Sequence, residues 1–113
     1  MVKRALSLGL DFGTNSVRAL LADVANGNEL ATAVHPYETG KEGIILDPAD
    51  PNLARQNPAD YIRGTETVVR SLLSKARRTD RLFDPSQVIG IGVDTTGSTP
   101  LPVDTTGTPL SFQ

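Results

Sequence analysis

Residues 9–18 of the sequence, GLDFGTNSVR, place a short polar turn between two strand-like segments. Before the turn, residues 5–10 alternate small side chains with leucines, which is the period-two pattern of a β-strand. Residues 17–24 continue in the same style after it. Because so few residues separate the two segments and Gly13 favours a turn, we expect an antiparallel hairpin, which restricts the sheets that the chain can form.

This turn also carries side chains that suit phosphate and a metal ion. Backbone N–H groups around Gly13 could converge on an anion. The Asp11 carboxylate suits a hydrated magnesium ion, and the hydroxyls of Thr14 and Ser16 suit phosphate oxygens. Arg18 adds a permanent positive charge. A nucleotide site is one interpretation of this stretch, and an ordinary turn without a ligand is the other.

The next segments extend the hairpin and then interrupt it. Asn26 and Gly27 form a turn signal, and residues 29–34 follow as a third short strand, so we predict an antiparallel meander. Residues 38–56 are rich in glycine and proline and poor in apolar side chains. We expect a long loop there that folds over a ligand or a partner domain.

A helix is predicted from Asn57 onwards. Asn57 is a capping residue, Pro58 suits the first helical position and Asp60 places an acid in the first turn. Apolar side chains then recur at intervals of three and four residues, so one side of the helix faces the core. The predicted stripe consists of Tyr61, Ile62, Thr65, Val68, Val69, Leu72, Leu73 and Ala76.

The last third of the chain contains an apolar run at residues 88–94 with no alternation of polarity. Such a run is typical of a strand covered on both faces, and the helix would cross over to place it parallel to the first strand. Residues 95–99 form a hydroxyl-rich loop at its carboxyl end, where open α/β sheets bind ligands. Residues 100–103 and 110–112 flank a turn and predict a small hairpin. The expected fold is α/β with a mixed sheet, in the order β-β-β-α-β plus a hairpin.

Composition narrows the class of protein. The 113 residues provide one domain or part of one, with 11 lysines and arginines against 13 aspartates and glutamates and no cysteine. Scattered charges argue against a nucleic-acid partner, which would need a basic surface. No apolar run approaches the ~20 residues that span a bilayer, so we expect no membrane association and a cytoplasmic location.

Three motifs resemble the FGGY family of carbohydrate kinases. They are GLDFGTNSVR at residues 9–18, NPADY at residues 57–61 and GIGVDTTGSTP at residues 90–100. The resemblance implies an actin-like, ribonuclease H-like ATPase fold in which residues 1–113 are the first part of the N-terminal domain. It also implies that the general base and the adenine-binding segment lie outside this chain, so the isolated chain should be inactive.

The resemblance further implies transfer of the terminal phosphoryl group of ATP to a sugar hydroxyl, with Mg²⁺. Within the family, residues 95–100 are similar to kinases of L-ribulose, an enzyme class of L-arabinose catabolism. Another ketose or polyol such as D-ribulose is the alternative substrate, and a non-catalytic actin-like nucleotide-binding protein is the alternative class. Homo-oligomerisation is left open. The implied roles are metal binding by Asp11, phosphate binding by Gly13, Thr14, Asn15, Ser16 and Arg18, with Arg18 also stabilising charge, and sugar binding by Thr96, Gly97 and Ser98.

Overall fold

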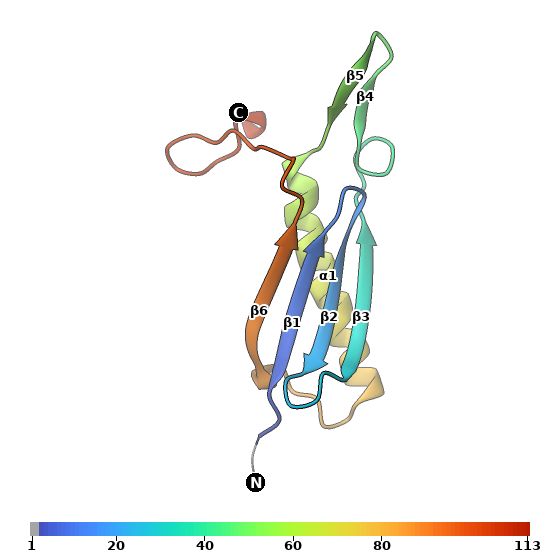
Figure 1. The fold of residues 1–113 in the computed structure, drawn as a ribbon, viewed down its shortest axis with the longest axis vertical. Coiled ribbons are helices and arrows are strands. Elements are labelled where there is room, and N and C mark those ends of the chain that lie inside the picture. Colours follow the sequence, from blue (N-terminus) through green and yellow to red (C-terminus); the bar gives the residue numbers. More distant parts are fainter. Residues whose placement is uncertain (1–2) are drawn as a thin grey trace.

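The computed structural model describes residues 3–113 and shows a four-stranded mixed sheet with one long helix on one face (Figure 1). The order of strands is β3-β2-β1-β6, in which β1 pairs antiparallel with β2 and parallel with β6. The predicted α/β class, the meander and the parallel crossover are therefore confirmed. The elements are β1 (Leu6–Phe12), β2 (Ser16–Asp23), β3 (Glu29–Pro36), β4 (Ile45–Asp47), β5 (Asp50–Arg55), α1 (Pro58–Thr79), η1 (Pro85–Gln87), β6 (Val88–Thr95) and η2 (Leu110–Phe112).

The core lies between α1 and the first three strands. Alternation places the leucines of β1 on the helix side, and the alternate residues of β2 join them there. The Asn26–Gly27 turn is confirmed, with Gly27 at a φ of 74° and its N–H donating to the Asp23 carbonyl over 2.8 Å. The buried apolar residues are Leu6, Leu8, Leu10, Val17, Ala19, Leu21, Ala33, Tyr37, Val68, Leu72, Ala76 and Phe83.

Helix α1 begins as the sequence predicts. The Asn57 side chain caps it by accepting from the Ala59 N–H over 3.0 Å, and Pro58 opens the first turn. The predicted stripe is wrong at Ile62, which is 60% exposed. In the first turns of the helix, Asp60 and Gly64 face inward instead, and Ile62 lies on the outer side.

Gly64 allows α1 to approach the sheet closely. A Cβ at this position would lie 3.0 Å from Val17 Cγ1 and 3.5 Å from both His35 Cδ2 and Tyr37 Cε1. We therefore expect Gly64→Ala to lower the free energy of unfolding of the full-length protein, since overpacking costs about 1–3 kcal/mol. Val17 is fully buried and has little room to move aside, so we expect this cost to exceed the roughly 1 kcal/mol gain in helix propensity. Thermal unfolding would measure the change, and a higher midpoint for the variant would contradict the prediction.

The predicted long loop at residues 38–56 is wrong, because much of it forms the β4–β5 hairpin. This hairpin projects beyond the end of the main sheet (Figure 1). The carboxylates of Asp47 and Asp50 accept backbone N–H groups two residues onward, each over 2.9 Å, and shape the connection. All three residues of β4 are exposed, so no pattern of burial marked it as a strand.

Within residues 3–113, no other element covers the faces of strand β6. It is the edge strand of the sheet, and α1 packs against β2 and β3 instead. Ile91 and Val93, the register partners of Leu8 and Leu10, lie on the helix side and remain 66% and 63% exposed. Ile89, at the irregularity in the pairing, is 70% exposed. The predicted cover is therefore absent within residues 3–113, because an apolar run does not specify which segments cover it. We expect the isolated chain to self-associate through this apolar strip and the free strand edge.

The predicted C-terminal hairpin is only partly present. Its turn forms, with Gly107 at a φ of 82° and its N–H donating to the Asp104 carbonyl over 3.0 Å. Val103 and Pro109 form a single bridge, and residues 110–112 turn into the short helix η2 rather than a strand. Pro109 has no N–H to continue a ladder. None of the helices in residues 3–113 is long and apolar enough to cross a membrane.

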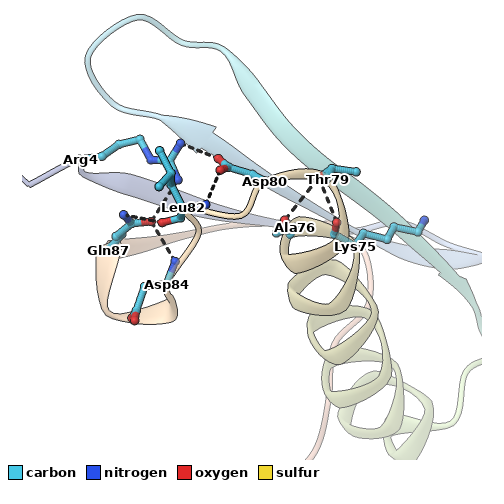
Figure 2. Close-up of polar contacts among 8 residues, drawn as sticks. All are labelled: Arg4, Lys75, Ala76, Thr79, Asp80, Leu82, Asp84 and Gln87. Carbon is cyan, nitrogen blue, oxygen red and sulfur yellow. Dashed lines mark hydrogen bonds and ion pairs between the residues drawn. The ribbon is translucent and has the colours of Figure 1, made fainter.

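Arg4 ties the start of the sheet to the end of α1 (Figure 2). Its guanidinium donates to the Asp80 carboxylate over 2.6 Å and to Gln87 Oε1 over 3.2 Å. Asp80 closes α1 through its N–H, which donates to the Ala76 carbonyl. The hydrogen bond from Arg4, followed by one from the Leu82 N–H, lowers the pKa of Asp80.

This lowered pKa predicts a pH dependence of stability. A depressed carboxyl pKa contributes stability above the unfolded pKa of about 3.9, and this contribution is lost as pH falls through the folded value. We expect the thermal midpoint of the full-length protein to fall more steeply below pH ~4 than that of Asp80→Asn. Arg4→Gln should flatten the profile in the same way. Parallel profiles for the three proteins would contradict this assignment.

Candidate active site

The sheet face opposite α1 carries a row of charged side chains. Asp11 is the register partner of Arg18 in β2 and of Asp94 in β6, so the three lie side by side across three strands. Their neighbours Leu10 and Ala19 are buried on the helix side, and alternation therefore directs the row to the open face. All three residues border one open hollow of about 600 Å³.

These charged side chains are available to a ligand. Asp11, Arg18 and Asp94 are exposed, and within residues 3–113 their side chains form no ion pair or hydrogen bond. Gly9 and Gly92, which are register partners, line the same hollow, and a Cβ at either would meet nothing within 4 Å. The floor beside the carboxylates is therefore bare backbone, which a ligand can approach closely.

The β1–β2 turn, defined as residues 13–16, follows Phe12, the last residue of β1. Thr14 and Asn15 are exposed, and Ser16 is the first residue of β2. The Gly13 N–H is already used, because it donates to the Ser16 carbonyl over 2.9 Å. Gly13 is also not in the left-handed region, and its role is close approach, with a Cβ 3.3 Å from the Ser16 carbonyl oxygen. Phosphate contacts from this turn would therefore come from the residues after Gly13.

The segment after β3 holds this turn in place. The Tyr37 N–H donates to the Asn15 carbonyl over 2.9 Å, and Asn15 Nδ2 donates to the Glu42 carbonyl over 2.7 Å. Tyr61 stacks between Phe12 and Tyr37, with ring centroids 5.6 and 5.0 Å apart. Burial, with smaller effects from the neighbouring Tyr61 and acids, raises the pKa of Tyr37.

The hydroxyl loop, defined as residues 95–99, lies at the same edge of the sheet as the β1–β2 turn. Phe12 and Thr95, which end β1 and β6, are register partners in parallel strands. Thr96 and Thr99 join their hydroxyls over 3.1 Å, and Gly97 and Ser98 are exposed. The structure thus brings the predicted phosphate and sugar residues to one end of the sheet. Asp94, absent from the predicted site, joins them through strand register.

Gln56 connects the two segments. Its Nε2 donates to the Thr14 carbonyl over 2.8 Å, and its Oε1 accepts from the Thr99 hydroxyl over 3.1 Å. No local pattern predicts this role, because Gln56 matches no motif and its partners lie 42 and 43 residues away.

A magnesium ion fits this arrangement. No group of three or more acidic, histidine or cysteine side chains that could hold a metal occurs in the part of the chain that the structure describes. Magnesium is ordinarily held by one or two carboxylates, with water and phosphate oxygens completing its six ligands. Asp11, with Asp94 beside it, offers that donor set on an open face.

Comparison with known proteins gives the class. The N-terminal domain of the FGGY family of carbohydrate kinases matches residues 6–112. The chain therefore belongs to the FGGY family of carbohydrate kinases, and its sheet is part of an actin-like ATPase fold.

Several similar relatives share one name, Ribulokinase. The chain is 40% identical over 105 residues to that of Vibrio parahaemolyticus, 41% over 110 residues to that of Geobacillus thermodenitrificans, and 44% over 102 residues to that of Bacillus licheniformis. These matches cover 93%, 94% and 87% of this chain, respectively. The chain spans 18% of the length of each relative.

Proposed function

We propose that the full-length protein transfers the terminal phosphoryl group of ATP to L-ribulose, giving L-ribulose 5-phosphate. The carrying observation is the row Asp11–Arg18 beside the β1–β2 turn, at the same sheet edge as the hydroxyl loop. Membership of the FGGY family and the relatives named Ribulokinase support the choice of reaction and sugar. Residues 1–113 would be the first part of the N-terminal domain of a cytoplasmic enzyme, and residues outside the chain would supply the general base and the adenine site.

The residues of the site suit the demands of phosphoryl transfer, which are mainly positioning and charge stabilisation. Asp11 would hold Mg²⁺ through its waters, and the bound ion would neutralise charge on the phosphates. Thr14, Asn15 and Ser16 would contact phosphate oxygens, with Gly13 allowing the turn. Arg18 would stabilise charge near the transferring group.

The hydroxyl loop would bind the sugar. Each hydroxyl of a sugar needs a hydrogen-bonding partner once water is excluded, and Thr96 and Ser98 offer such partners. Gly97 leaves space between them, since a Cβ there would meet nothing within 4 Å. Another ketose or polyol such as D-ribulose is the second candidate, because small hydroxylated side chains suit any of them.

A substrate panel tests the proposal. Purified full-length protein with ATP and Mg²⁺ is assayed on L-ribulose, D-ribulose, further ketoses and polyols, with ADP release and sugar phosphate both measured. We expect the highest kcat/KM for L-ribulose and no turnover by the isolated chain. A higher kcat/KM for another sugar would reassign the substrate. ATP binding without phosphorylation of any sugar would favour a non-catalytic actin-like protein.

A further inference from the structure

Gln56 is the one side chain in the described part of the molecule that hydrogen-bonds to both the β1–β2 turn and the hydroxyl loop. Its amide donates to the Thr14 carbonyl, and its carbonyl oxygen accepts from the hydroxyls of Thr99 and Tyr61 over 3.1 and 3.0 Å. Thr99 in turn contacts Thr96 in the loop. A continuous chain of hydrogen bonds therefore runs between the two predicted halves of the site.

The network fixes the orientation of the amide. In the reversed orientation, the side-chain oxygen would face the Thr14 carbonyl oxygen, and two acceptors would oppose each other. Only Nε2 can donate to Thr14, while Oε1 has two lone pairs for the two hydroxyls. Each end of the amide thus has a distinct task.

The backbone around Gln56 is anchored. It lies between the end of β5 and Asn57, the residue that caps α1. Asn57 Nδ2 donates to the Thr39 hydroxyl over 3.2 Å, and that hydroxyl donates to the buried Asp60 carboxylate over 2.8 Å. The start of the helix therefore holds Gln56 in position between the two segments.

We propose that Gln56 is a positioning residue that sets the spacing between the β1–β2 turn and the hydroxyl loop. This inference rests on the proposed function, in which the two segments hold phosphate and sugar. Transfer requires the reacting atoms to approach within a narrow distance, and misplacement by about 1 Å can cost 10²-fold in rate. Gln56 would maintain that geometry without touching either reactant.

The first test is Gln56→Glu in the full-length protein. This variant keeps an oxygen that can accept from the Thr99 and Tyr61 hydroxyls. It loses the donor to Thr14 and instead places a carboxylate oxygen against the Thr14 carbonyl oxygen. We expect kcat to fall about tenfold or more and the KM for ATP to rise, with a smaller change in the KM for the sugar. The matched control is Gln87→Glu, which removes a 3.2 Å donation to the Leu82 carbonyl at the opposite end of β6 (Figure 2). The control should retain wild-type kinetics.

The second test changes Thr99, so it remains informative even if the Gln56→Glu variant folds poorly. Thr99→Val removes the hydroxyl and should lower kcat and raise the KM for the sugar, whereas Thr99→Ser should restore both. In a double-mutant cycle with Gln56→Ala, the cost of Thr99→Val should shrink to about threefold or less, because the shared contact is already gone.

The outcomes separate this inference from the proposed function. Wild-type protein that phosphorylates no sugar would overturn the proposed function and the inference that rests on it. Active wild-type protein with Gln56→Glu indistinguishable from Gln87→Glu would overturn the positioning role alone. The positioning role would also be overturned if the fold-losses in kcat of Gln56→Ala and Thr99→Val multiplied in the double variant. If Gln56→Glu lowers the thermal midpoint more than the control does, the comparison of Thr99→Val with Thr99→Ser tests the positioning role instead.

Discussion

Asp11→Asn should reduce the kcat of the full-length protein by about 10²- to 10³-fold, because it removes a charge placed at the phosphates while keeping the size of the side chain. Asp11 is exposed on the open face between Arg18 and Asp94, and its side chain supports no internal contact in residues 3–113. Its replacement should therefore leave folding intact. We also expect the variant to need a higher Mg²⁺ concentration for half-maximal activity.

Steady-state kinetics at several Mg²⁺ concentrations would measure this effect. Asp23→Asn is the matched control, since Asp23 lies at the opposite end of the same hairpin and pairs with Leu6. Asparagine at this position keeps the oxygen that accepts from the Ala25 N–H. Retention of more than a third of the wild-type kcat by Asp11→Asn would remove Asp11 from the site.

Of the substitutions considered, Leu72→Ala should cause the largest decrease in the free energy of unfolding. Leu72 is completely buried in the face of α1 that packs on the sheet. Truncation of a buried leucine costs about 2–5 kcal/mol, through lost apolar burial and the cavity left behind. Unfolding of the full-length protein by urea, followed by circular dichroism, would show the lower midpoint.

Ile62→Ala is the control for this prediction. Ile62 lies on the same helix and has a similar aliphatic side chain, but it is 60% exposed. We expect its change to be within about 0.5 kcal/mol, as for most surface substitutions. Equal losses at the two positions would show that α1 does not pack in the arrangement described.

Local signals in the sequence predicted the main sheet and the helix. The Asn26–Gly27 turn and the Asn57 cap act within a few residues, so their effects could be read directly. The β4–β5 hairpin was missed because its strands are exposed and its turn contains proline. The cover of β6 cannot be predicted from its own residues, because packing by distant segments decides what covers a strand.

In the site, too, local motifs could be predicted from the sequence, whereas contacts between distant segments could not. The β1–β2 turn and the hydroxyl loop were predicted from residue types and motifs, and the structure places them at one sheet edge. Asp94 enters the row through the register of β1 and β6, and Gln56 through contacts across more than 40 residues. Neither relation has a local pattern in the sequence.

The bare floor formed by Gly9 and Gly92 offers a way to separate folding from function. A methyl group at either position meets nothing within 4 Å, and alanine is less costly than glycine in a strand. Alanine substitutions there should leave the stability of this domain unchanged or slightly higher. Any loss of activity in the full-length protein would then show that a ligand or another domain contacts the sheet at these two glycines during the reaction.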